Sequence, residues 1–420
     1  MMLERILSRE NLLLALERVE KNKGSHGIDK MPVESLREHI VNHWHILKEQ
    51  ILSGTYLPSP VRRVEIPKPN GGIRKLGIPT VIDRFLQQAI AQVLTQIYDP
   101  TFSYQSYGFR PNKRGHDAVR QARNYIKEGK RWVVDIDLEK FFDKVNHDRL
   151  MQKLSERIKD RRVLQLIRRY LQSGVMEHGL VQPNTEGTPQ GGPLSPLLSN
   201  IVLDELDKEL ESRGLSFVRY ADDCNIYVRS KRAGLRTMEN LTNFIEGKLK
   251  LKVNEQKSAV DRPWKRKFLG FSFTVDKHNP KIRIHKESMK RFKQRIRKLT
   301  SRKHSIDMER RLERLNQYLV GWLGYYQLAE TPSVFKKMDS WIRRRLRMIR
   351  WKEWKKIKTK HTNLKKLGID KGKAWEWANS RKAYWRISNS PILHLALGNQ
   401  YWNELGLKSL FDRYEHMRWT

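Results

Sequence analysis

The chain contains only one cysteine, Cys224, among its 420 residues. A single cysteine excludes a disulfide within the chain and a zinc site built from cysteines. Long apolar runs are also missing, since none approaches the roughly 20 residues that a helix needs to cross a bilayer. The N-terminus is typical of a charged amphipathic helix and not of a signal peptide. These absences favour a protein of the reducing cytoplasm without membrane contact.

Acidic residues are few compared with basic ones. The chain has 84 Lys and Arg against 46 Asp and Glu, which gives a formal net charge of +38. An excess of this size favours a polyanionic partner, and nucleic acid is the leading candidate. An anionic membrane surface fits less well, because the basic residues are spread along the whole chain. A basic surface that serves only solubility is the simplest alternative.

Half of the charge excess lies in residues 281–360, which contain 26 Lys and Arg against 7 Asp and Glu. Nine of the twelve tryptophans lie beyond residue 320. From about residue 286 the pattern predicts long helices, and basic helices interleaved with aromatic rings are suited to clamp a nucleic acid. Any single tryptophan there is more often a core residue of a helical bundle than a stacking platform.

Residues 61–275 predict alternating strands and helices. The segment 61–79 predicts a hairpin around the turn 69–72, and apolar spacing predicts a helix over 82–98. The order β, α, β, β, α, β over 131–275 is the split βαβ, or ferredoxin-like, pattern. Its segments are a strand at 131–138, a helix ending at Gly214, a hairpin over 216–230, a helix and strand over 241–260, and a hairpin-forming stretch at 268–273.

Two adjacent carboxylates, Asp222 and Asp223, lie at the tip of the predicted hairpin in RYADDCNIYV. Because side chains alternate along a strand, Asp135 and Asp137 share one face of the strand at 131–138. The two segments are neighbours in a split βαβ sheet, so the carboxylates should meet. Clustered carboxylates imply bound metal or raised pKa values, and oxygen ligands indicate Mg²⁺. Two such ions serve phosphoryl transfer. The Asp-Asp pair alone is equally well explained by a solvated turn.

Several other segments accompany these carboxylates. As an ordered set they resemble the bacterial group II intron-encoded reverse transcriptases over essentially the whole chain. The matching segments are IPKPNGGIRKLGIPT (66–80), SYGFRPNKRGHDAV (106–119), DIDLEKFFD (135–143), GTPQGGPLSPLLSNI (187–201), YADD (220–223), LKVNEQKSAV (251–260), FLGFSF (268–273) and GWLGYY (321–326).

The resemblance implies an α+β fold, a right-hand polymerase with a ferredoxin-like palm. It implies an N-terminal extension (1–60), fingers and palm (61–285), a helical thumb or maturase domain (286–360) and a small basic C-terminal DNA-binding domain (361–420). Many relatives end in a zinc-bearing endonuclease with paired cysteines. Because the single cysteine lies far upstream of the C-terminus, we expect the short class that lacks this endonuclease.

The resemblance also implies a metal site. Asp137 and Asp222 resemble the main ligands of two Mg²⁺ ions, and Asp223 resembles the third carboxylate. The backbone carbonyl of Leu138 is expected to complete a metal shell. Asp135 is expected to be a supporting residue or an ion-pair partner.

A nucleotide site follows from the same resemblance. Phe142 resembles the aromatic steric gate, whose ring would collide with a ribose 2′-hydroxyl. The other expected contacts are Lys68 and Arg74 with the triphosphate, Gln190 with the incoming nucleotide, Lys257 as proton donor to pyrophosphate, and Leu269 and Gly270 as the primer grip. The alternatives are a core position for Phe142 and a solvated surface position for Lys257.

We therefore expect an RNA-directed DNA polymerase that also binds intron RNA to assist splicing and mobility. Its expected partners are group II intron RNA, an RNA template with a DNA primer, target DNA and deoxynucleoside triphosphates. We expect it in the bacterial cytoplasm, and at the nucleoid when it is bound to target DNA. Three alternatives stay open: a splicing cofactor without essential polymerase activity, a domesticated reverse transcriptase in defence or repair, and a palm-type RNA polymerase, against which Phe142 argues. The sequence leaves the oligomeric state open.

Overall fold

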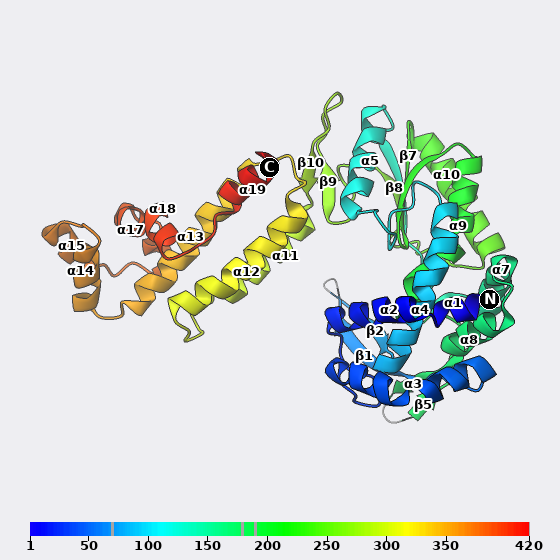
Figure 1. The fold of residues 1–420 in the computed structure, drawn as a ribbon. Coiled ribbons are helices and arrows are strands. Elements are labelled where there is room, and N and C mark those ends of the chain that lie inside the picture. The colour runs from blue at the N-terminus through cyan, green and yellow to red at the C-terminus, as the bar shows by residue number, and fades with distance from the viewer. Residues whose placement is uncertain (69–70, 178–179, 189–190, 420) are drawn as a thin grey trace. The chain divides into compact units, whose positions relative to one another are not determined.

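The computed structural model of the chain describes residues 1–68, 71–177, 180–188 and 191–419. These residues form two compact units, Met1–Pro263 and Trp264–Thr420, whose elements are drawn in Figure 1. No helix in the described part of the chain is both long and apolar enough to cross a membrane. The domain boundaries expected at residues 60, 285 and 360 stay predictions.

One buried helix organises the N-terminal part of the first unit. α4 (Val81–Tyr98) confirms the helix predicted over 82–98, and thirteen of its residues are buried. A helix buried on most sides needs cover all round. α1 (Met2–Ile6) and α2 (Arg9–Asn22) pack against it. Trp44 of α3 (Leu36–Ser53) adds an edge-on contact with Phe85, at 6.3 Å between ring centroids.

A buried carboxylate fixes the start of α4. Asp83 accepts hydrogen bonds from the hydroxyl groups of Tyr56 and Thr80, both at 2.7 Å, and from the backbone N–H of Ser59 at 3.1 Å. Thr80 also caps the helix, because its Oγ1 accepts from the Asp83 N–H at 3.1 Å. Burial raises the pKa of the Asp83 carboxyl. The group thereby ties the segment around 56–59 to the first turn of α4.

The hairpin predicted over 61–79 is confirmed as β1 (Val61–Pro67) and β2 (Ile73–Ile78). It belongs to a sheet of order β2-β1-β4-β5, whose other members are β4 (Val175–Glu177) and β5 (Leu180–Gln182). Neither of these short strands was predicted from the sequence. Three residues are too few to show a recognisable alternation of apolar and polar side chains.

A second sheet carries the predicted split βαβ pattern. Its order is β6-β7-β3-β8, and each neighbouring pair is antiparallel. The last strand lies beside the first and the third separates the first from the second, which is the ferredoxin-like arrangement. Its elements are β3 (Trp132–Ile136), α9 (Ser195–Ser212), β6 (Ser216–Tyr220), β7 (Asp223–Val228), α10 (Lys231–Phe244) and β8 (Ala259–Asp261).

The hairpin-forming stretch predicted at 268–273 is confirmed. It supplies β9 (Phe271–Phe273), which pairs antiparallel with β10 (Ile282–Ile284) in the second unit and not with the strands of the ferredoxin-like sheet. The chain leaves the first unit at Pro263. Proline has no backbone N–H and cannot continue a ladder of hydrogen bonds, so β8 ends before it.

The two faces of the ferredoxin-like sheet are covered by different helices. α10 packs on one face, where Gly234 lets Val134 come close. α5 (Gly115–Lys127) packs on the other face, where the rings of Tyr125 and Tyr227 lie 5.8 Å apart. Figure 1 shows these two helices on either side of the sheet. Asp135 alternates with Val134 along β3 and so points to the α5 side.

The second unit is helical. After β9 and β10 come α11 (Lys286–Leu299), α12 (Met308–Tyr326) and α13 (Ser333–Glu353). The shorter helices that follow are α14 (Ile357–Lys366), α15 (Lys371–Ala378), α16 (Tyr384–Ile387), α17 (Pro391–Ala396), α18 (Asn399–Glu404) and α19 (Leu410–Trp419). Trp351 and Trp402 are core residues, whereas Trp375 is 56% exposed. The tryptophans of this region thus divide between core and surface.

We predict that Asp83→Ala destabilises the first unit by about 3 kcal/mol, because it leaves two hydroxyl groups and one backbone N–H buried without an acceptor. Urea-induced unfolding measures the change. The matched control is Asp148→Ala, which removes a 79% exposed carboxylate from a surface ion pair with Arg168. That change should stay within about 0.5 kcal/mol. Equal effects of the two substitutions would contradict the role given to Asp83.

Candidate active site

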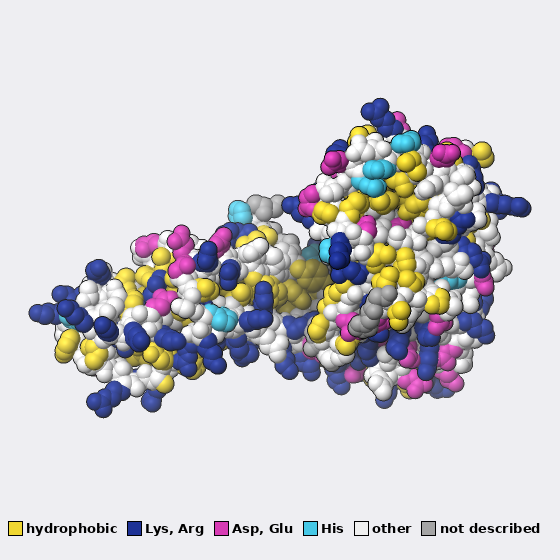
Figure 2. All heavy atoms as spheres, turned by 90° about the horizontal axis from the view of Figure 1, so that it is seen from below, with side chains coloured by type: hydrophobic (Ala, Val, Ile, Leu, Met, Phe, Trp, Pro, Cys, Tyr) yellow, Lys and Arg dark blue, Asp and Glu magenta, His cyan; other side chains and the backbone are white. Residues whose placement is uncertain are grey.

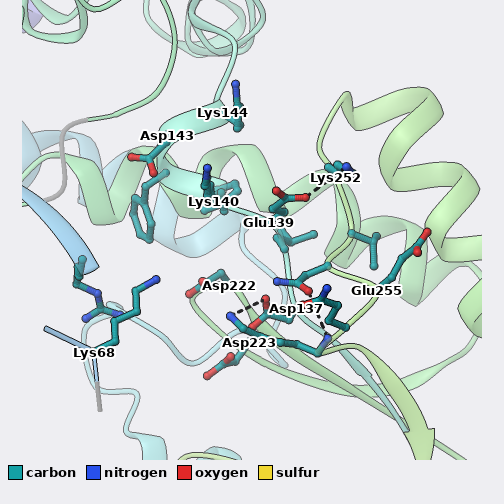
Figure 3. Close-up of a pocket in the computed structure, with 18 of the residues that line it drawn as sticks. Lys68, Asp137, Glu139, Lys140, Asp143, Lys144, Asp222, Asp223, Lys252 and Glu255 are labelled. Atoms are coloured by element: carbon teal, nitrogen blue, oxygen red, sulfur yellow. Dashed lines mark hydrogen bonds and ion pairs between the residues drawn. The ribbon is translucent and has the colours of Figure 1, made fainter. Parts of the chain in front are cut away.

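Strand pairing brings two acidic segments together at one end of the ferredoxin-like sheet. β3 and β7 are antiparallel, and Ile136 lies opposite Cys224. The end of β3 therefore meets the start of β7. Asp137 follows β3 directly, and Asp222 and Asp223 stand at the start of β7. Figure 3 shows the three carboxylate side chains gathered in one part of a pocket.

The turn between β6 and β7 consists of Ala221 and Asp222, with Tyr220 and Asp223 paired across it. Ala221 adopts a left-handed backbone conformation, with φ 57°. This conformation costs a residue with a Cβ atom roughly 1 to 2 kcal/mol. It persists only where surrounding contacts impose it, so the shape of this turn depends on its neighbours.

The carboxylates influence one another through their charges. Burial raises the pKa of the Asp222 carboxyl, and the negative charge of Asp137 raises it further, whereas the charges of Arg74 and Lys257 oppose the shift. The Oδ1 atom of Asp137 lies 3.4 Å from the ammonium group of Lys257. The backbone N–H of Asp137 donates to Ser258 Oγ at 3.0 Å. Asp137 is therefore held in place by the segment that carries Lys257.

These carboxylates line a cleft of about 1080 Å³ in the first unit. Its wall carries seven Lys or Arg and seven Asp or Glu side chains. Figure 3 shows Lys68 across the pocket from Asp222. Most of the residues predicted for the site line this cleft: Lys68, Arg74, Asp137, Leu138, Phe142, Asp222, Asp223 and Lys257. The structure thus joins residues that span 190 positions of the sequence.

The acidic part of the cleft fits a divalent cation. The charge of Asp137 disfavours ionisation of Asp222, and a cation bound between two carboxylates relieves this repulsion. In the described part of the chain, no group of three His, Cys, Asp or Glu side chains is arranged to hold a metal ion by itself. Mg²⁺ commonly binds through one or two carboxylates and takes its other ligands from water and substrate phosphates. The pair Asp137 and Asp222 meets this requirement.

A neighbouring loop fixes the backbone of Phe142. Phe142 lies on the short helix α6 (Phe141–Lys144). The N–H of Thr188 donates to the Phe142 carbonyl at 2.6 Å, and the N–H of Gly187 donates to the Val145 carbonyl at 2.7 Å. Gly187 has φ +87°, and a Cβ atom there would lie 2.7 Å from the Phe142 carbonyl oxygen. The loop and α6 are therefore in direct backbone contact, which only glycine permits at position 187.

Two predicted residues, Leu269 and Gly270, are not among those that line the cleft. Gln190 lies outside the described residues. Leu269 and Gly270 belong to the second unit, where both have positive φ, 49° and 84°. There the Tyr325 hydroxyl donates to the Leu269 carbonyl at 2.7 Å, and the Ser288 hydroxyl donates to the Gly270 carbonyl at 2.9 Å. The role of all three stays a prediction.

Two family models match part of each unit. Residues 66–273 match the family described as "Reverse transcriptase (RNA-dependent DNA polymerase)", and residues 289–368 match "Group II intron, maturase-specific domain". Protein YkfC of Escherichia coli (strain K12) is 34% identical over 297 residues, which cover 61% of this chain and 78% of YkfC. The chain belongs to the group II intron reverse transcriptase and maturase family.

Two further relatives carry intron names. The group II intron-encoded protein LtrA of Lactococcus lactis subsp. cremoris is 31% identical over 293 residues, covering 54% of this chain and 49% of LtrA. The putative COX1/OXI3 intron 2 protein of Saccharomyces cerevisiae is 37% identical over 205 residues, covering 48% of this chain and 24% of that protein. The matched region is thus half or less of these two relatives. Reverse transcriptase domains use divalent metal ions, which agrees with the paired carboxylates.

Some residues of the cleft in this reverse transcriptase were not predicted from the sequence. Lys75, Lys140, Lys144 and Lys252 also line the cleft, but single lysines carry no recognisable signal in a chain this basic. No role was predicted for Arg219 either, which is completely buried beneath the β6–β7 turn. A signal for Arg219 exists in SFVRY, where one charged residue interrupts an apolar strand.

We predict that Gly187→Ala costs about 2 kcal/mol more in unfolding free energy than Gly214→Ala, measured by urea denaturation. Both glycines have positive φ, so both substitutions bear the strain of a left-handed backbone. Only Gly187 is crowded, because nothing lies within 4 Å of a Cβ atom at Gly214. The difference in unfolding free energy between the two variants therefore measures the clash of the new Cβ atom with α6. Equal losses would show that the loop moves away from Phe142 without resistance.

Proposed function

We propose that this chain is an RNA-directed DNA polymerase of a group II intron, and that it also binds intron RNA to assist splicing and mobility. The observation that carries the proposal is the pair Asp137 and Asp222, held together in a cleft that Lys68 and Arg74 also line. Its template is RNA paired with a DNA primer, its substrates are deoxynucleoside triphosphates, and target DNA is a further partner.

In this reaction the primer 3′-oxygen attacks the α-phosphorus of the nucleotide, the bond from that phosphorus to the bridging oxygen breaks, and pyrophosphate leaves. Asp137 and Asp222, with Asp223 and the Leu138 carbonyl, would hold two Mg²⁺ ions, which supply Lewis-acid activation of the attacking and leaving oxygens. Both carboxylates come from the adjoining ends of paired strands, so their separation is fixed before any substrate arrives.

The basic residues of the cleft act on the triphosphate. Lys68 follows β1 and Arg74 lies on β2, and both side chains are exposed and line the cleft. Their charges stabilise the negative charge that develops on the leaving group. Lys257, whose ammonium group lies 3.4 Å from Asp137, is proposed to give a proton to the departing pyrophosphate. Gln190 is proposed to contact the incoming nucleotide, and Leu269 and Gly270 the primer.

Phe142 selects the sugar in this proposal. Its side chain is half-buried and lines the cleft, and its ring stacks edge-on against Phe141 at 5.2 Å between centroids. A ring fixed in this way collides with a ribose 2′-hydroxyl but leaves room for deoxyribose. The same argument disfavours an RNA polymerase, which has to admit the hydroxyl.

The second unit supports the maturase half of the proposal. It contains residues 289–368, which match the maturase family, and much of the charge excess. On the face seen in Figure 2, many Lys and Arg side chains and few Asp and Glu side chains lie over this helical unit. Arginines also stack on aromatic rings, as Arg344 does on Trp385 at 4.0 Å. Such surfaces suit an RNA backbone with exposed bases.

We predict that Asp222→Asn lowers primer extension on an RNA template by at least about 1000-fold, which corresponds to roughly 4 kcal/mol of transition-state stabilisation. Binding of intron RNA, measured by filter retention, should change less than about threefold, because phosphate contacts dominate such affinity. Asp148→Asn, an exposed carboxylate in a surface ion pair, serves as the control. Tight RNA binding without any DNA product from the unaltered chain would favour a splicing cofactor instead.

A second substitution tests sugar selection. Phe142→Ala should lower the preference for deoxynucleotides over ribonucleotides by at least about tenfold, because the ring no longer meets the 2′-hydroxyl. Phe142→Tyr keeps the ring and should keep the preference. Single-nucleotide insertion kinetics with both sugars measure the ratio. An unchanged ratio in Phe142→Ala would assign the selection to another residue.

A further inference from the structure

Arg219 is a fully buried arginine three residues before Asp222. It lies on β6, and its side chain has no exposed surface. An arginine side chain has five N–H donors. Here all of them have acceptors, which are both carboxylate oxygens of Asp207 (2.7 and 2.5 Å), Asn200 Oδ1 (3.0 Å), Ser106 Oγ (2.8 Å) and the Ala221 carbonyl (2.9 Å). The planar guanidinium therefore fixes three separate parts of the first unit relative to one another: α9, which carries Asn200 and Asp207, the loop at Ser106, and the turn at Ala221.

Arg219 and Asp207 form an ion pair with no exposed side-chain surface, and burial raises the pKa of the Asp207 carboxyl. Burial disfavours the charged guanidinium, but the adjacent charge of Asp207 and its hydrogen bonds outweigh burial and raise the pKa of Arg219. Such a pair is weak evidence for extra stability, because both charges lose their hydration. The pair instead fixes the orientation of the Arg219 guanidinium, since a guanidinium binds a carboxylate through two parallel hydrogen bonds in one plane.

One of these hydrogen bonds acts on the catalytic turn itself. The Ala221 carbonyl belongs to the peptide group that joins Ala221 to Asp222. Fixing its oxygen fixes the plane of that peptide and thus the direction in which the Asp222 side chain leaves the backbone. Ala221 has φ 57°, so the turn needs outside contacts to keep its shape. Arg219 supplies such a contact, because its guanidinium donates a hydrogen bond to the Ala221 carbonyl from inside the core.

The loop 105–108, which is distant in the sequence, packs directly against the same turn. The backbone of Arg219 exchanges hydrogen bonds with it, from the Arg219 N–H to Gln105 (3.0 Å) and from the Tyr107 N–H to Arg219 (2.8 Å). Asn200 accepts from Arg219 and donates to the Gly108 carbonyl at 2.8 Å. A Cβ atom at Gly108 would lie 2.3 Å from the Ala221 nitrogen. Arg219, Asn200 and this loop thus enclose the turn.

We propose that Arg219 is a positioning residue for the metal-binding carboxylate of Asp222, acting through the Ala221 carbonyl and through the loop 105–108. This inference rests on the proposed function, because it assumes that Asp222 binds the divalent ion. Asp207, Asn200 and Ser106 contribute by orienting the guanidinium. None of these residues lines the cleft, so they act on the reaction only through the turn.

The test substitutes Arg219→Lys in the full chain, which keeps the charge but loses the planar set of donors. Mn²⁺ alone is the probe, and its binding is followed by electron paramagnetic resonance without nucleotide or primer. We expect the affinity for Mn²⁺ to fall about 10- to 100-fold, as for other residues that orient metal ligands. Hydrogen exchange of the 219–223 amides should accelerate. In primer extension kcat should fall while KM for the nucleotide stays within about threefold.

The matched control is Arg311→Lys. Arg311 is equally buried, at 2% exposed, and donates to the carbonyls of Leu299, Ser301 and His304 in the second unit. It should lose stability without any change in Mn²⁺ affinity. Asn200→Ala is a milder variant that removes one acceptor of Arg219, and it should weaken Mn²⁺ binding in a chain that still unfolds cooperatively.

Unchanged Mn²⁺ affinity and exchange in folded Arg219→Lys, or in Asn200→Ala if Arg219→Lys does not fold, would overturn the proposal. A loss matched by Arg311→Lys would also overturn it, because the effect would then be general destabilisation. Failure of the proposed function has a different signature: the unaltered chain would bind Mn²⁺ through Asp222, as shown by loss in Asp222→Asn, but would make no DNA. That result leaves the role of Arg219 at the metal site supported.

Discussion

The antiparallel pairing of β3 with β7 brings together Asp137 and Asp222, the two carboxylates on which the proposed function depends. The ladder runs from Trp132↔Val228 to Ile136↔Cys224, so the last residue of one strand faces the second residue of the other. A slip of one residue would move every side chain of β3 to the opposite face of the sheet. The apolar contacts of Val134 and Ile136 with the core hold the register. The position of Asp137 relative to Asp222 is thus a consequence of the burial of apolar residues just before it on β3.

Charge is distributed unevenly over the molecule. The chain as a whole carries +38, but the wall of the cleft has equal numbers of basic and acidic side chains. A locally balanced cleft can accept a highly charged nucleotide together with its metal ions, because the complex brings little net charge. The strongly basic surfaces lie elsewhere and serve long polyanions, whose affinity grows with the number of phosphates neutralised. The proposed reaction and the proposed binding of RNA thus draw on different parts of the charge pattern.

Much of this architecture could be predicted from the sequence where the signal is local. The β1–β2 hairpin, α4 and the strands around YADD all have clear periodicity or turn residues. β4 and β5 were missed because strands of three residues have no period. The hairpin at 268–273 was predicted but its partner strand β10 was not, because sequence order does not show which segment a strand pairs with. The network around Arg219 joins residues more than a hundred positions apart, from Ser106 to Arg219, and only the fold reveals it.

The single thiol of the chain lies one residue beyond Asp223, in the pairing that defines the site. Cys224 is buried, and burial raises the pKa of its thiol above the ordinary value. A neutral, inaccessible thiol is a poor nucleophile toward alkylating reagents. We therefore expect the folded protein not to react with thiol-specific labels. A cysteine introduced at an exposed position such as Lys68 or Leu57 would be the one reactive site, so fluorophores or spin labels can be placed without first removing a native residue.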